Sequence, residues 1–250
     1  MSGHSHWATI RRKKGAADAK RGQAFTRLAR EIVLAAREGG GDPDNNVGLA
    51  IAIDKARASN MPKDNIERAI KRGTGDSKEG GTLEQVFYEG YAPHGVALMV
   101  ETVTDNRNRA VSDIRHALSR HGGSMAEAGS VSWQFNRIVA FSFPLDDHDP
   151  DKIFELAVEA GAEDVIFDRE VEITGPIESF KSISESLRAA KIKPDEAGMH
   201  FVPSNEIELS DENTLQVLRL VEALEEMDDV QNVYHNMKVS DAVWAHLEEA

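Results

Sequence analysis

The chain has 250 residues, 40% of them hydrophobic, and a formal net charge of −14. This length and composition predict a folded protein of two or three domains and exclude a disordered chain. The sequence contains no cysteine, which excludes disulfides, cysteine-ligated zinc and thiol chemistry. No apolar run reaches the length of a membrane span and no apolar signal segment follows Met1, so we expect a cytoplasmic protein without membrane contact.

Apolar periodicity predicts three short helices in the N-terminal part. Phe25, Leu28, Ile32 and Val33 repeat at helical spacing, and Gly39–Gly41 ends this first helix. The opposite face of the helix carries basic side chains, namely Arg27, Arg30 and Arg37. The second helix is expected to begin at Asp42-Pro43, with Val47, Ala50, Ile51 and Ile53 on its inner face. The third begins at Asn60-Met61-Pro62 and ends at Gly73, and a flexible linker follows over 73–81.

The pattern then changes to strands and helices. Strands are expected at 83–91, 95–103 and 130–135, with a helix that Asp105 caps over 105–121. Residues 138–202 follow the order βαββαβ, which is the ferredoxin-like split. A helix over 211–227 and a strand over 230–234 remain, and we expect them to return to the earlier sheet.

The predicted fold class is therefore α and α+β multidomain, with an N-terminal three-helix bundle followed by two α+β domains. The expected domains are a basic bundle over 1–80, a discontinuous domain over 81–136 plus 205–250, and a ferredoxin-like insertion over 137–204.

The two parts of the chain carry opposite charge. Residues 1–80 hold 16 basic and 10 acidic side chains, a net charge of +6, whereas residues 81–250 have a net charge of −20. Such asymmetry is typical of a protein that holds a polyanion on one part. We expect nucleic acid as the partner of the N-terminal part and, for the acidic domains, either no contact or a protein partner such as the ribosome.

Seven sequence blocks resemble one family, the YebC family. They are GHSHW at 3–7, DAKRG at 18–22, NMPKDNIERAIKRGTG at 60–75, YEGYAPHGVA at 88–97, TDNRNR at 104–109, GSVSWQF at 129–135 and DDVQNVY at 228–234. The resemblance spans nearly the whole chain and implies a helical N-terminal domain with two α+β domains. It also implies a probable transcriptional regulator that binds DNA. Mitochondrial relatives are translational activators of cytochrome c oxidase, and some bacterial relatives act on the ribosome.

The candidate nucleic-acid contacts are basic side chains that can hydrogen-bond phosphate and release condensed counterions. They are Arg11, Arg12, Lys13, Lys14, Lys20, Arg21, Arg27, Arg30, Lys71, Arg72, Arg107 and Arg109. Two alternatives are open for the helix that carries Lys71 and Arg72. Ion pairs Asp64–Arg68 and Glu67–Lys71 neutralise part of its charge, or its basic side chains extend the nucleic-acid surface. Trp7 either stacks on an unpaired base or packs onto the bundle.

No catalytic residue, cofactor or resident metal is expected. Acidic residues cluster at 146–151, but no glycine shapes this loop as in a calcium-binding hand, which favours a solvated turn. Once Met1 is removed, Ser2 and His4 offer a square-planar nitrogen set for Cu(II) or Ni(II), unless this chemistry is incidental.

Three functions stay open: a DNA-binding transcriptional regulator, a ribosome-associated translation factor that binds rRNA or tRNA, and a metal-dependent nucleic-acid hydrolase. The family favours the first. The acidic remainder of the chain favours docking into a large ribonucleoprotein, and the third lacks a clear carboxylate cluster.

Overall fold

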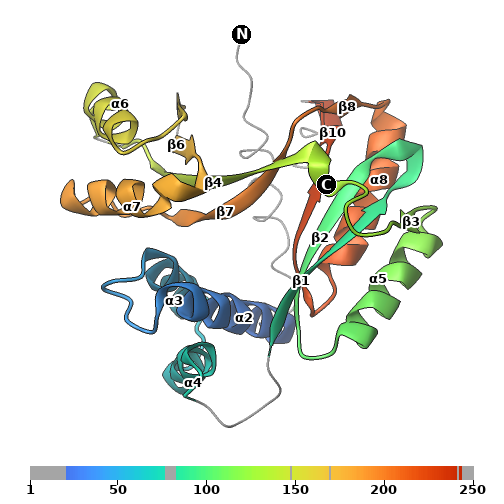
Figure 1. Ribbon diagram of the computed structural model, residues 1–250, viewed down its shortest axis with the longest axis horizontal. Helices are drawn as coiled ribbons and strands as arrows, with labels where there is room; N and C mark the ends of the chain where they lie inside the picture. The colour runs from blue at the N-terminus through green and yellow to red at the C-terminus, as the bar shows by residue number, and fades with distance from the viewer. Residues whose placement is uncertain (1–20, 77–82, 147, 169, 241, 244–250) are drawn as a thin grey trace.

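The computed structural model describes residues 21–76, 83–146, 148–168, 170–240 and 242–243. Figure 1 shows three parts: the helices α2, α3 and α4, a sheet covered by α5 and α8, and a second sheet that carries α6 and α7. This arrangement confirms the fold class predicted from the sequence, an α and α+β multidomain protein. Within the described residues, no helix is both long and apolar enough to span a bilayer.

The N-terminal part consists of α2 (Arg21–Gly39), α3 (Val47–Ala58) and α4 (Lys63–Thr74). Their inner faces share one core that includes Ile32, Leu49 and Ile66, and Leu83 and Val103 of the following domain extend it. The helical periodicity of α2 is thus confirmed. In α3 the prediction is confirmed for Ile51 and Ile53, which are buried, but Val47 and Ala50 are only partly buried. The rest of the inner face is formed by Leu49, Ala52 and Ala56.

The helix boundaries also differ from the prediction. Asn46 caps α3 by accepting a hydrogen bond from the backbone N–H of Leu49 at 3.0 Å, and Asp42-Pro43 belongs to the preceding turn. α4 continues through Gly73 to Thr74, and Gly75, with a φ of 83°, ends the helix. A side chain at Gly73 would place its Cβ 2.6 Å from the backbone oxygen of Val33, so glycine there permits close packing of α4 on α2.

The first sheet has the strand order β3-β1-β2-β9 and is antiparallel throughout. Its strands are β1 (Glu84–Tyr91), β2 (Ala97–Thr104), β3 (Ser124–Met125) and β9 (Val230–His235). All eight residues of β2 are buried, as expected of a central strand covered on both faces. The predicted return of the last helix and strand to this sheet is confirmed.

Two helices cover one face of the first sheet, namely α5 (Arg107–Arg120) and α8 (Asp211–Glu225) (Figure 1). Ile114 and Leu118 of α5 and Val217 and Val221 of α8 pack there against the sheet. Asn106 caps α5 by accepting from the backbone N–H of Arg109 at 3.1 Å, so the predicted cap at Asp105 is wrong by one residue.

The second sheet has the order β5-β6-β4-β7, which is the antiparallel ferredoxin-like arrangement that the βαββαβ order predicts. It contains β4 (Phe135–Pro144), α6 (Pro150–Glu159), β5 (Asp164–Phe167), β6 (Glu170–Gly175), α7 (Phe180–Ala189) and β7 (Glu196–Pro203). Its core includes Phe141, Ile173 and Ile183. After the second sheet, β8 (Ile207–Glu208) forms a two-stranded parallel pair with β10 (Met237–Lys238), which follows β9.

The predicted strand at 130–135 is wrong. Ser132–Gln134 forms a 3-10 turn, and β4 begins only at Phe135. The physical reason is that the backbone N–H groups of Val131 and Ser132 donate to the carboxylate of Glu89 instead of to a neighbouring strand.

Candidate nucleic-acid interface

One buried carboxylate joins α2 to the first sheet and to α5. Asp229, in the turn before β9, accepts hydrogen bonds from Arg30 Nη2 at 2.8 Å, from Arg109 Nη2 at 2.9 Å and from Thr104 Oγ1 at 3.1 Å. Arg30 and Asp229 are largely buried, with side chains 12% and 9% exposed, whereas Arg109 is 47% exposed. We call the set Arg30, Thr104, Arg109 and Asp229 the Asp229 junction.

Local chemistry places these side chains. Thr104 ends β2, and its hydroxyl also accepts from the backbone N–H of Asn106, the residue that caps α5. Asp105 accepts a second hydrogen bond from Arg109 at 3.0 Å. The hydrogen bond and charge of Asp229, and to a lesser extent those of Asp105, raise the pKa of Arg109 above its ordinary value. The TDNRNR block therefore builds a helix start whose arginine reaches back into the junction.

Two of the three arginines on the basic face of α2, Arg27 and Arg30, are partly buried, whereas Arg37 is exposed. Arg30 binds Asp229, Arg27 donates to the backbone oxygen of Gln231, and Arg37 donates to that of Leu83 at 2.7 Å. The basic face is thus opposite the apolar one, as predicted, but β9 and the turn before it pack beside α2 and cover Arg27 and Arg30. For Arg27 and Arg30, the charge predicted for phosphate serves first to hold two parts of the protein together.

The remaining predicted contacts differ in their surroundings. Arg107 is 65% exposed and pairs with Glu84, whereas Arg72 is half-buried. In α4, Glu67 pairs with Lys63 at 3.5 Å, and neither predicted side-chain pair, Asp64–Arg68 nor Glu67–Lys71, is the one formed. Lys71 is exposed and has no ion-pair partner among the residues that the structure describes.

Most predicted sites in the N-terminal segment concern residues outside the described ranges. These are Arg11, Arg12, Lys13, Lys14 and Lys20, the aromatic Trp7, and the metal set at Ser2 and His4. Arg21 is the first residue of α2. All of these remain predictions from the sequence.

A second carboxylate, which is only partly buried, organises a loop that sequence reasoning missed. Glu89 on β1 accepts hydrogen bonds from the backbone N–H groups of Gly129, Val131 and Ser132 at 2.7, 2.6 and 3.0 Å. The loop presents Trp133, which is 72% exposed and donates its indole N–H to the backbone oxygen of Ser130. The signal for both carboxylates was present in the sequence, because Glu89 and Asp229 lie inside blocks shared with the family.

A third acidic residue, Glu101 on β2, accepts hydrogen bonds from Gln85, Asn232 and Tyr234. Burial and the Glu101 carboxylate raise the pKa of Tyr234 well above its ordinary value, so its hydroxyl stays a hydrogen-bond donor. Phe201 of β7 packs edge-on against Tyr234 with ring centroids 5.2 Å apart. The second sheet is thereby fixed to the first.

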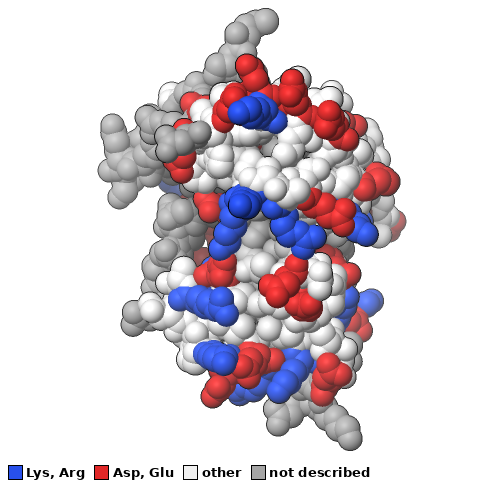
Figure 2. All heavy atoms as spheres, turned by 90° about the vertical axis from the view of Figure 1, so that its left-hand side faces the viewer, with Lys and Arg blue, Asp and Glu red and all other residues white. Residues whose placement is uncertain are grey.

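Basic side chains also bridge the second sheet and the N-terminal helices. Figure 2 shows Lys and Arg side chains gathered where the upper and lower parts of the protein meet. Lys193 pairs with Asp54 of α3, Lys55 of α3 lies 3.5 Å from Glu196 of β7, and Arg188 donates to a backbone oxygen of the turn before α3. These pairs are exposed or half-exposed, so each stabilises the contact only weakly.

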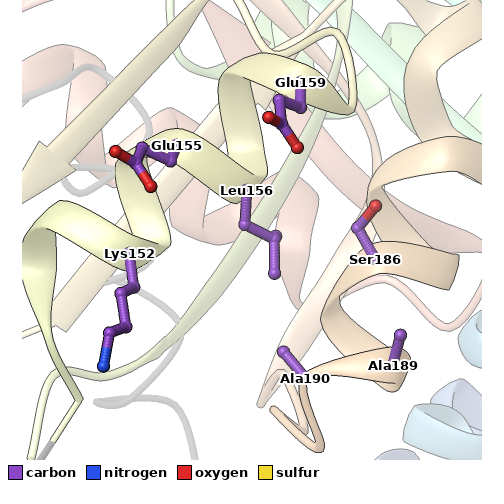
Figure 3. A pocket seen from close by; sticks show the side chains of 7 residues that line it. All are labelled: Lys152, Glu155, Leu156, Glu159, Ser186, Ala189 and Ala190. Carbon is purple, nitrogen blue, oxygen red and sulfur yellow. The ribbon is translucent and has the colours of Figure 1, made fainter.

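The cavities offer little to a substrate. A shallow pocket of about 350 Å³ lies between α6 and α7. Figure 3 shows Lys152, Glu155, Leu156 and Glu159 on α6 facing or flanking it, with Ser186 opposite on α7. Within the described ranges, no group of three or more His, Asp or Glu side chains is arranged to hold a metal ion. Asp149 of the acidic loop instead caps α6, accepting from the backbone of Asp151.

The fold and these junctions define a multidomain α+β protein whose basic helices are fastened to two acidic α+β domains. The model of the TACO1/YebC N-terminal domain matches residues 5–76, and that of the TACO1/YebC second and third domain matches residues 83–237. The chain belongs to the TACO1/YebC family, as its sequence blocks predicted.

Relatives of the full length support this assignment. A "Probable transcriptional regulatory protein" of Acidithiobacillus ferrooxidans is 52% identical over 249 residues and covers 99% of both chains. One of Chlorobaculum parvum, with the same name, is 49% identical over 251 residues and covers 100% of both. The crystal structure of a conserved hypothetical protein from Aquifex aeolicus has a TM-score of 0.79 and 42% identity, covering 95% of this chain and 98% of that one.

Proposed function

We propose that this protein is a non-enzymatic regulator of transcription that binds DNA through its basic N-terminal part. The observation that carries the proposal is the charge split, a net +6 over residues 1–80 against −20 over residues 81–250. A basic part attracts the phosphate backbone and releases its counterions, while an acidic part is repelled by it. The two together would orient the protein on DNA with the helices toward the duplex.

The names of the full-length relatives support transcription as the regulated step. They do not favour the ribosome-associated alternative toward which the acidic charge pointed. The proposed contacts are also redistributed by the geometry. Since Arg27 and Arg30 are engaged by β9 and Asp229, the main phosphate contacts are assigned to Arg11–Lys14 and Lys20-Arg21.

The test is binding of the full chain to labelled duplex DNA, measured by fluorescence anisotropy across a series of salt concentrations. Replacing Arg11, Arg12, Lys13 and Lys14 with alanine should weaken binding to all sequences equally. The slope of log affinity against log salt should fall by roughly 3–4, because each lost phosphate contact removes about 0.9. A matched control removes four exposed charges elsewhere, at Lys152, Lys181, Lys191 and Arg219.

The control should leave the slope unchanged, because it removes no phosphate contact. Equal affinity of the Arg11–Lys14 variant and the unaltered protein would contradict the proposed site. RNA of equal charge serves as competitor. If RNA displaces the protein far better than any duplex, and no duplex site is bound near 10⁻⁸ M or tighter at physiological salt, DNA is the wrong ligand.

A further inference from the structure

The outer face of α5 is basic although it lies in the acidic half of the protein. Its inner face, with Ala110, Ile114, Ala117 and Leu118, is buried against the first sheet and α8. The outer face is made of exposed hydrogen-bonding and basic side chains, namely Asn108, Arg109, Ser112, Arg115, His116, Ser119 and Arg120. Asp113 is the only acidic residue in the helix.

The geometry of the helix arranges the side chains of this outer face in rows. At 3.6 residues per turn, Asn108, Ser112 and Ser119 form a row along the middle of the face. Arg115 flanks the row on one side, and Arg120 flanks it on the other. Small hydrogen-bonding side chains bordered by arginines suit contact with a phosphate backbone, because both kinds of group donate to phosphate oxygens.

Two of the four arginines of α5 can bind a ligand without breaking an observed contact. Arg107 and Arg109 are held by Glu84 and Asp229. Arg115 and Arg120 are exposed, and neither has a hydrogen-bond or ion-pair partner for its side chain in the described part of the chain. Nothing in the observed packing therefore uses their charge, in a region where carboxylates outnumber basic groups.

The basic face of α5 begins beside α2. Arg30 of α2 and Arg109 of α5 bind the same carboxylate, so the two helices meet at the Asp229 junction. From Arg109 at the junction to Arg120, α5 runs for about 17 Å. The neighbouring helix α8 exposes Glu212 and Glu222, which would bound a phosphate-binding surface on that side.

We propose that the outer face of α5 is a second contact surface for duplex DNA, with Arg115 and Arg120 as its phosphate contacts. This inference rests on the proposed function, because it takes the same ligand. Guanidinium groups bind phosphate in a bidentate manner and stay charged at any physiological pH. Asn108, Ser112 and Ser119 add neutral contacts to the backbone. The surface contributes affinity and orientation and does not by itself read the base sequence.

The experiment compares Arg115→Gln/Arg120→Gln with the unaltered full chain in the same anisotropy titrations. The double variant should bind duplex DNA about tenfold more weakly at 0.1 M salt, and its salt slope should fall by about 2, as expected for two lost contacts. The matched control is Lys152→Gln/Lys181→Gln, which removes two exposed positive charges from α6 and α7 of the other α+β domain. Circular dichroism and urea unfolding check that both variants are folded.

Two results would overturn the inference in different ways. If the α5 variant binds like the control while the Arg11–Lys14 variant is weakened, α5 is no contact surface and the proposed function stands. If the unaltered protein shows no salt-dependent binding to duplex DNA, the proposed function falls and the α5 surface falls with it.

Discussion

Glu89 shows how a single carboxylate can shape a loop. Burial alone raises the pKa of Glu89, but the hydrogen bonds from the backbone of Gly129, Val131 and Ser132 outweigh it, and the pKa lies below its ordinary value of 4.5. The ionised carboxylate is therefore the form that holds the loop. An acidic residue of this kind belongs to the fold and not to the solvated acidic surface that its charge suggests.

Glu89→Gln should lower the free energy of unfolding by about 1–3 kcal/mol at pH 7, because an amide oxygen accepts these hydrogen bonds more weakly than a carboxylate. Since the folded protein depresses this pKa, the stabilisation is present above pH 4.5 and is lost as the pH falls through the folded-state pKa. Urea unfolding of both proteins from pH 7 downward measures the difference.

The difference between the two proteins should therefore shrink below pH 4.5. Glu127→Gln, an exposed change in the same loop, should leave stability unaltered at every pH. A constant difference between Glu89→Gln and the unaltered protein across the pH range would refute the role of the ionised form.

At the scale of elements, α2 packs against other parts of the protein through two faces, one apolar and one basic, which its helical periodicity separates. Its apolar face packs into the bundle around Ile32 and Val33, and its basic face packs against β9 through Arg27 and Arg30. The close approach of α4 to α2 depends on the missing side chain at Gly73. Packing of this tightness leaves no room for even one added methyl group.

Gly73→Ala should destabilise the N-terminal helices by about 1–3 kcal/mol, because its Cβ would lie 2.6 Å from both the Ala36 Cβ and the Val33 backbone oxygen. Gly48→Ala in α3 is the matched control, since its Cβ would meet nothing nearer than 3.6 Å. That change should be neutral or stabilising by up to about 1 kcal/mol, as alanine favours the helix. Thermal unfolding followed by circular dichroism compares them, and equal midpoints would contradict this account of α2–α4 packing.

At the scale of the whole molecule, the charge split is less clean than the sequence implies. Basic groups of α2 bind the first sheet through Asp229, and α3 exchanges ion pairs with the second sheet through Lys193 and Lys55. The opposite signs of the two parts thus also attract the parts to one another. The buried junction at Asp229 should matter most, because the other pairs are screened by solvent.

Asp229→Asn should lower the free energy of unfolding by about 3 kcal/mol, because it leaves the largely buried Arg30 without a counter-charge. Arg109 is half-exposed, so its guanidinium group can be hydrated once Asp229 is replaced. The expected loss of stability therefore lies at the low end of the range for breaking a buried ion pair. Asp228→Asn, an exposed change one residue away, should cost less than about 0.5 kcal/mol. Hydrogen exchange should report faster opening of α2 only in the first variant, and equal stability of the two would exclude the junction as a joint between parts.

The sequence by itself determined the fold class and most elements, because these depend on local patterns. The 3.6-residue repeat of α2 and the βαββαβ order of residues 138–202 each have one packing solution that buries their apolar side chains. The family blocks contain Glu89 and Asp229, but the sequence did not single out either residue. Counting charges identified the positively charged part of the chain, but it did not show which basic side chains form contacts within the protein.

Only the tertiary structure decided which arginines are free. Arg27 and Arg115 look alike in the sequence, yet Arg27 is engaged by a strand 204 residues away and Arg115 is exposed without a partner among the described residues. The strand predicted at 130–135 failed for the same reason, since the distant Glu89 takes its backbone hydrogen bonds. Long-range contacts of this kind leave no periodic trace, because they depend on which segments the folded chain brings together.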